Sequence, residues 1–457
     1  MRNLSIAVCA LLSLCLLTGA ARRRSVRSTN PIPVLNLERS FAITDRVTLA
    51  PFRFERVLDA LVARSNVPGM TAEKLFRQWF DTQNPKPGLD ASMPHCNDEM
   101  TNGKPSLNGF QQACPADGGF LANAPFQPDE LIPIAITNRF DQATGANCGQ
   151  YRIAYALKRG APQDTFHVIF EAALPNPDPS GDLASCRPVA QFWADLSGIA
   201  SRDERRVRLE QFFFEGLDGF APVFDPDNYH IAPAGIRTLQ LTAPQNLLHF
   251  FQYRLIRECG SASSCKLYMK PDVLENTVFG GLFDAHVTTP QAVAFREDFV
   301  KQVKTLVIPN VNLYTLNIPA QFLVPDTQPT LEDEQPSFVG AFTAGLSTTA
   351  GLAFRDAIEA ESRKAGSTLG ANLILTRVIT QNCAGCHFGG IPVGDGINFP
   401  LAIRDFQQVT EDQIITGEGG PASRFAISGA MSQVFIPHRM QILRDYLATG
   451  KAPVHSN

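Results

Sequence analysis

The run Cys383–Ala384–Gly385–Cys386–His387 has the residue types and the spacing that most clearly specify chemistry in this chain. Two thiols three positions apart can capture the two vinyl groups of a haem as thioethers, and the imidazole that follows can bind the iron. The sequence therefore predicts one covalent haem per chain, attached through Cys383 and Cys386, with His387 as an axial iron ligand. A protein of this kind handles electrons or a small molecule that binds to iron.

Two other uses of this pair of thiols stay open, a zinc half-site and a redox dithiol. Zinc would need further thiol or imidazole ligands, and none lies within about thirty residues on either side, well beyond the usual ligand spacing. A thioredoxin-like dithiol normally begins a helix after a strand, whereas the residues before Cys383 have a helical pattern. Haem attachment is the interpretation that fits both the spacing and the place of the motif.

The motif needs elements that position it, and the sequence predicts a helix on either side. Residues 370–382 form the first, because apolar residues recur four positions apart within it. Ser367 and Thr368 are possible N-caps of this helix. Residues 437–450 form the last helix, which a proline opens and a glycine ends. The segment from 370 to 457 is long enough to enclose a haem between these two helices.

The same segment resembles a class I c-type cytochrome domain. The residues that carry the resemblance are the first helix, the C-x-x-C-H motif, a loop-rich middle and a last helix with a Tyr-Leu pair, Tyr446 and Leu447. The resemblance covers only the part of the chain from residue 370 onward. It implies covalent haem c, His387 as the proximal ligand and a distal methionine from the loop before the last helix.

Several residues are candidates for the distal ligand. Met431 stands where the resemblance places the methionine, and His438, Met440 or an open site are the alternatives. A methionine ligand would raise the reduction potential of the haem, whereas a second histidine would lower it. The anionic propionates of a haem could meet an arginine, although an exposed surface position is the more common role of that residue type. The arginines after the motif are Arg404, Arg424, Arg439 and Arg444.

The remaining cysteines indicate an oxidising compartment. Two of the ten cysteines lie in the N-terminal apolar stretch and two in the haem motif, which leaves six. An even number in an exported chain suggests disulfides, each of which adds about 2 to 4 kcal/mol of stability. Six cysteines allow 15 connectivities, which the sequence leaves open. Pairing between sequence neighbours closes the shortest loops and gives Cys96–Cys114, Cys148–Cys186 and Cys259–Cys265.

The N-terminus predicts export. Residues 4–21 are apolar and end in small residues, which is typical of a signal peptide over residues 1–21 that is removed from the mature protein. Arg22, Arg23 and Arg24 follow directly and would resist translocation, so an uncleaved anchor is the alternative. No later segment is apolar enough to span a bilayer. We expect a periplasmic or secreted protein without a membrane span, unless the signal is retained.

Composition and periodicity predict a globular α+β fold. Apolar residues make up 44% of the chain and charged residues 18%, and the net charge of −4 argues against a nucleic-acid partner. Few βαβ alternations occur among the predicted strands, which favours an antiparallel sheet. The predicted parts are a loop-rich region with two helices (22–130), an antiparallel-sheet domain with flanking helices (131–284), a helical connecting region (285–366) and a mostly helical, cytochrome c-like haem domain (367–457).

Individual elements follow from the same patterns. The predicted helices are at 51–65, 71–82, 188–196, 202–216, 290–306 and 353–365, and residues 325–347 are expected to connect two of them. The predicted strands are at 131–138, 151–157, 165–173, 236–241, 247–256 and 266–270. Asn138–Arg139–Phe140–Asp141 closes the first of these strands, where Arg139 and Asp141 could pair or bind a ligand.

These observations favour an exported monohaem c-type protein that transfers single electrons. Its partner would be a redox protein or a small-molecule electron donor or acceptor. One alternative is a haem-dependent, peroxidase-like oxidoreductase whose substrate binds at the domain junction, so the sequence leaves open whether the chain is an enzyme. Another is an exported binding protein in which the haem serves as a sensor.

Overall fold

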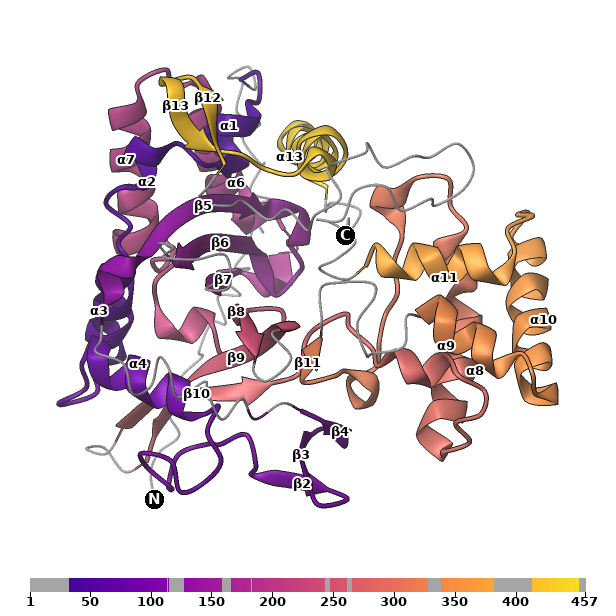
Figure 1. Ribbon diagram of the computed structural model, residues 1–457. Helices are drawn as coiled ribbons and strands as arrows, with labels where there is room; N and C mark the ends of the chain where they lie inside the picture. Colours follow the sequence, from indigo (N-terminus) through magenta and orange to yellow (C-terminus); the bar gives the residue numbers. More distant parts are fainter. Residues whose placement is uncertain are drawn as a thin grey trace, which may run out of the picture. The chain divides into compact units, whose positions relative to one another are not determined.

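An eight-stranded antiparallel sheet is the largest element of the computed structural model (Figure 1). The structure describes residues 33–112, 114, 127–157, 166–181, 183–242, 247–260, 265–327, 338–381 and 413–451. The strands lie in the order β1 (Ala42–Ile43), β5 (Leu131–Arg139), β6 (Asn147–Leu157), β7 (Phe166–Pro175), β8 (Gly235–Thr242), β9 (Leu247–Cys259) and β10 (Cys265–Asp272). β11 (Asp326–Thr327) pairs with β9 beyond the end of β10. The predicted antiparallel α+β architecture is confirmed.

Helices flank the sheet, and each predicted helix is present in the described residues. The helices are α1 (Leu37–Ser40), α2 (Arg46–Leu49), α3 (Phe54–Ser65), α4 (Ala72–Asp81), α6 (Arg187–Gly198), α7 (Arg202–Glu210), α8 (Pro290–Leu306), α9 (Phe338–Gly345), α10 (Thr349–Lys364), α11 (Ala371–Ile379) and α13 (Ile436–Thr449). Side-chain N-caps explain where several helices begin. The side chains of Thr71, Ser201 and Thr348 each accept a hydrogen bond from the backbone N–H group three residues later.

Two local predictions were wrong. Residues 325–347 contain α9, whose apolar residues pack against α10 and α11, so this stretch is more than a connection. Neither Ser367 nor Thr368 caps α11, because Gly370 occupies the N-cap and its carbonyl accepts the first helical bond, from Ile374. The Ser367 hydroxyl instead accepts from the amide of Leu369, a local turn that competes with capping.

One face of the sheet packs an aromatic core. Period-2 alternation in β6 turns Tyr151 and Tyr155 to the same side, where helices cover them. Tyr151 stacks on Trp193 of α6 with ring centroids 5.4 Å apart, and Tyr155 meets Phe54 of α3 edge-on at 5.2 Å. The same alternation forces Arg152, between the two tyrosines, onto the opposite face.

A second hydrophobic core joins the helices that follow the sheet, and we call it the helical core. It includes apolar residues of α8–α11 and reaches the π-helical turn η11 (Met431–Phe435). The boundary expected at 366/367 therefore falls inside one packed core, because α10 and α11 both contribute to it. The predicted haem domain stays a prediction, since residues 382–412 lie outside the described part of the chain.

The last helix, α13, packs against the earlier part of the chain. The Tyr446 ring lies 4.7 Å from that of Phe140 in the short helix η3 (Phe140–Gln142), and its hydroxyl donates to the carbonyl of Leu183. The hairpin of β12 (Ile414–Gly417) and β13 (Gly420–Phe425) also reaches back, since Thr44 donates to the carbonyl of Phe425 at 2.8 Å. The β12–β13 hairpin and α13 thus dock on the N-terminal half.

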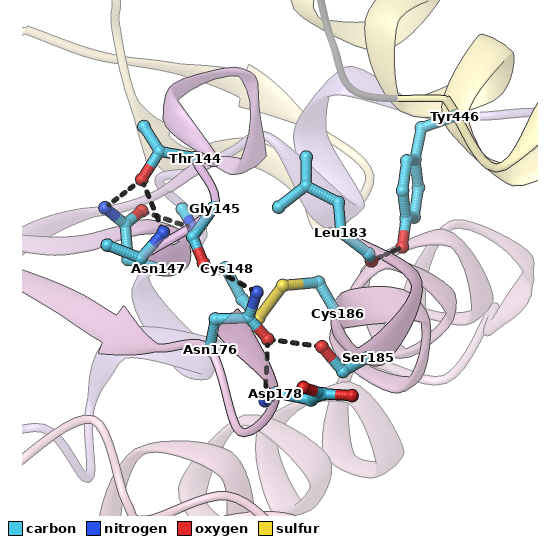
Figure 2. Close-up of a disulfide and its surroundings, with 12 residues drawn as sticks. Thr144, Gly145, Asn147, Cys148, Asn176, Asp178, Leu183, Ser185, Cys186 and Tyr446 are labelled. Carbon is cyan, nitrogen blue, oxygen red and sulfur yellow. Dashed lines mark hydrogen bonds between the residues drawn. A yellow bond between two sulfur atoms is a disulfide. The ribbon is translucent and has the colours of Figure 1, made fainter. Parts of the chain in front are cut away.

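The three predicted disulfides are confirmed. Cys148–Cys186 joins the start of β6 to the residue before α6, with α-carbons 5.2 Å apart (Figure 2). Cys259–Cys265 closes the β9–β10 hairpin, and Cys96–Cys114 pins the loop region that also holds β2 (Glu99–Thr101), β3 (Lys104–Leu107) and β4 (Phe110–Gln111). Among the described helices, none combines the length and the apolar character needed to cross a membrane.

Candidate functional site

The haem motif lies outside the described residues. Cys383, Cys386 and His387 fall within 382–412, as does Arg404. α11 ends at Ile379, four positions before Cys383. What the structure describes next to the motif is therefore α11 on one side and the segment from residue 413 on the other.

Met431, the predicted distal ligand, is the first residue of η11. Its backbone amide donates to the hydroxyl of Ser428 at 3.2 Å, which fixes the start of the turn. Its half-buried side chain packs against the helical core, to which Ile374 and Val378 of α11 also belong. A thioether and the helix that leads to the motif therefore share one apolar environment, which suits a methionine ligand.

His438, the alternative ligand, lies in the first turn of α13. The imidazole is half-buried, and its Nε2 atom has no hydrogen-bond partner among the residues that the structure describes. Burial lowers the pKa of His438, although the nearby Asp141 carboxylate opposes this effect. The neutral ring, which is the form that binds metal, is thus favoured. Met440 is half-buried in the same helix.

The face of the sheet opposite the aromatic core carries buried polar side chains. Glu171 of β7 lies between two arginines: its Oε1 is 3.0 Å from Arg152 on β6, and its Oε2 is 3.2 Å from Arg237 on β8. Arg237 also donates to Oε1 of Gln252 on β9 at 3.1 Å. Four neighbouring strands thus contribute to one network. We use the name polar face for these four residues together with Gln150 and Arg254, which lie on the same side of β6 and β9. The polar face thus consists of Gln150, Arg152, Glu171, Arg237, Gln252 and Arg254.

A buried ion pair extends the polar face toward α13. Arg139 at the end of β5 donates to both carboxylate oxygens of Asp141, at 2.8–3.1 Å, as the sequence had suggested. Arg439 of α13 lies 3.7 Å from the same carboxylate, and its guanidinium is 6.0 Å from the ring centroid of Phe435. Because Phe435 belongs to the helical core, Arg439 connects the sheet with the helices.

Desolvation sets the electrostatics of this region. Burial lowers the pKa of Arg152 to about 10, although Glu171 opposes the shift by favouring the charged form. The positive charges of Arg139 and Arg237 add to the lowering. The guanidinium groups on this face are hydrogen-bond donors only, so a further ligand here would have to accept hydrogen bonds.

The other predicted propionate partners have ordinary roles where the structure describes them. Arg424 forms an ion pair with Glu38 at 3.1 Å, and Arg444 is exposed beside Gln441 on α13. Arg439 differs from both, because it is buried next to Asp141. Within the described residues, no group of three or more His, Cys, Asp or Glu side chains could hold a metal ion.

A hydrogen-bonded relay of Asp284, His286 and Ser347 also lies on the surface. Its geometry resembles a nucleophilic triad, with His286 Nδ1 2.9 Å from Asp284 and Nε2 3.0 Å from the Ser347 hydroxyl. Solvent reaches 51% of the histidine side chain. The relay therefore lies in water rather than in the low-dielectric pocket where such a triad accelerates acyl transfer.

Comparisons with protein-family models, with curated proteins and with solved structures found no match to the chain. The candidate site is therefore defined by residues alone. Sequence reasoning found Arg139 and Asp141 but missed the polar face. The missed signal is the alternation of charged or amide residues inside otherwise apolar strands, as at Gln150/Arg152 in β6 and Gln252/Arg254 in β9.

Proposed function

We propose that this chain is an exported protein that carries one covalent haem c and transfers single electrons. One observation carries the proposal: the C-A-G-C-H run at 383–387 has the thiol spacing and the adjacent imidazole that haem attachment requires. The three disulfides support export, because such bonds persist in oxidising compartments such as the periplasm or the extracellular space.

The roles of the residues follow from their chemistry. Cys383 and Cys386 would hold the haem, and His387 would bind its iron. When bound, the haem supplies a reversible one-electron change at the iron. We propose Met431 as the distal ligand, because its half-buried side chain packs against the helical core, to which α11 also belongs. His438 is the alternative, since it offers a neutral imidazole whose Nε2 is buried.

A spectrum and a mass test this proposal directly. The full chain is produced in a host with a cytochrome c maturation system, and the pyridine haemochrome spectrum is recorded. We expect a spectrum of the thioether-linked type and a mass that exceeds the polypeptide by one haem. The variant Cys383→Ser/Cys386→Ser serves as the control and should lose both signals. Colourless wild-type protein with the mass of its polypeptide alone would overturn the proposal.

A haem-dependent oxidoreductase is the second candidate, and the polar face favours it. Arg439 connects this face with the helical core, so a substrate held there would lie where the sheet meets the helices. The two functions differ at the iron. A low-spin iron that is unchanged by CO and cyanide indicates electron transfer, whereas a high-spin iron that binds both indicates an enzyme.

A further inference from the structure

Two buried nitrogen atoms on the polar face lack a hydrogen-bond acceptor. They are Nη1 of Arg254 and Nε2 of Gln252. Within the described residues, neither atom has a hydrogen-bond partner. Both residues are more than nine-tenths buried, with 7% and 2% of their surfaces exposed. A buried donor without an acceptor is unfavourable, so a pair of them on neighbouring side chains calls for an explanation.

Neighbouring groups fix the direction of both donors. Asp272 binds Nε of Arg254, and Glu275 accepts from its Nη2 at 2.9 Å, which leaves Nη1 as the remaining donor group of the guanidinium. Arg237 donates to Oε1 of Gln252, which determines the position of the amide nitrogen. The two donors are thus held in place by ion pairs and by the paired strands β8, β9 and β10.

Gly235 brings the two donors together. A β-carbon at this position would lie 3.4 Å from Nη1 of Arg254 and 3.5 Å from Nε2 of Gln252. Both nitrogens therefore border the same point above β8, together with the carbonyl oxygen of Tyr253, which lies 3.1 Å from it.

We propose that Arg254 and Gln252 form a binding site for the carboxylate group of a small organic acid. A carboxylate has two acceptor oxygens and a negative charge, which match one cationic and one neutral donor side by side. The charged members of the polar face and their ion-pair partners balance, because three arginines (Arg152, Arg237, Arg254) face three carboxylates (Glu171, Asp272, Glu275). The match to a carboxylate therefore comes from the two unpartnered donors and not from net charge.

The carboxylate has two possible sources, a free acid or a propionate of the covalent haem of the proposed function. Titration calorimetry with acetate and succinate, on the haem-loaded protein and on the full-length Cys383→Ala/Cys386→Ala variant, distinguishes them. Saturable binding to both forms assigns the site to a free acid. Binding to the haem-free variant alone assigns it to a propionate. If neither form binds either acid, the proposal is overturned, and buried water then satisfies the two donors.

Variants of Arg254 and Gln252 test whether these residues bind the acid. Arg254→Lys and Gln252→Glu should each weaken acid binding about tenfold or more, because each removes a charge-assisted or directed donor. Arg257→Lys is the matched control, since Arg257 lies on the same strand but is exposed, and it should leave binding unchanged. Equal binding by wild type, Arg254→Lys and Gln252→Glu contradicts the assignment.

Circular dichroism shows whether each variant is folded. If a variant does not fold, the titrations of the wild-type protein still test the proposed carboxylate site. The proposed carboxylate site is formed by Gln252 and Arg254 of β9 and does not require bound haem. Colourless protein that binds acetate would therefore refute the haem proposal and leave this one standing.

Discussion

Arg139 and Asp141, two positions apart, form a pair of buried charges in which the guanidinium donates three hydrogen bonds to the carboxylate. Arg439 approaches the same carboxylate from α13. One buried anion thus faces two guanidinium groups from distant parts of the sequence. The pair therefore holds the end of β5 against the last helix.

Replacing Asp141 with asparagine should destabilise the protein strongly. The amide side chain would have nearly the same shape but would leave two buried guanidinium groups without their opposing charge, and breaking a buried pair in this way costs about 3–5 kcal/mol. The free energy of unfolding in urea measures the loss. Asp203→Asn, at an exposed carboxylate, is the control and should change stability little. Equal stabilities of the two variants would show that the buried pair contributes nothing.

The disulfides should differ in their contributions because they close loops of different length. Cys148–Cys186 spans 38 residues and Cys259–Cys265 spans 6. Loop-closure entropy then gives about 4 kcal/mol for the first and about 2 kcal/mol for the second. Urea unfolding of the two double-alanine variants measures both values. A larger loss from the hairpin disulfide would contradict the loop-length argument.

The distal haem ligand can be assigned by comparing Met431→Ala with His438→Ala. If Met431 binds the iron, its removal should lower the reduction potential and open the iron to CO, because a thioether ligand raises the potential. His438→Ala should then leave both properties unchanged. Redox titration and CO difference spectra of the haem-loaded variants provide the measurement. The opposite pattern would assign the ligand to His438.

Buried tyrosines predict a cooperative loss of stability at high pH. Burial raises the pKa of Tyr151, Tyr155, Tyr229 and Tyr253 above the ordinary value near 10. Their contribution is complete below pH 10 and is lost as the pH rises above it, since the unfolded chain then releases protons that the folded chain retains.

Tyrosinate absorbance as a function of pH tests this expectation. In the native protein these four side chains should ionise only when the chain unfolds, whereas in guanidinium all seven tyrosines should ionise near pH 10. A native titration curve that matches the unfolded one would show that the four hydroxyls are accessible.

Local patterns in the sequence were sufficient for the long strands of the main sheet, for most of the long helices and for the disulfides. Enrichment in β-branched and aromatic residues predicted the strand at 151–157 that β6 contains, and closure of short loops predicted all three cysteine pairs. The polar face was not predictable in the same way, because it depends on strand register. Only the pairing of Arg152 with Glu171, and of Arg237 with Gln252, brings these side chains together.

The same reasoning applies to the packing of the helices. The side chains of α11 pack into the helical core, and α13 packs against η3 and α6. Contacts of this range depend on which apolar surfaces meet in three dimensions. No periodicity within a single segment specifies them.

The contact of Tyr446 with Phe140 and Leu183 has a consequence for how the cell handles this protein. A chain that lacks α13 leaves the Phe140 ring, between β5 and β6, and the Leu183 carbonyl, before α6, uncovered. Such exposed groups favour proteolysis, so the lifetime of the folded polypeptide depends on the fourteen-residue helix α13.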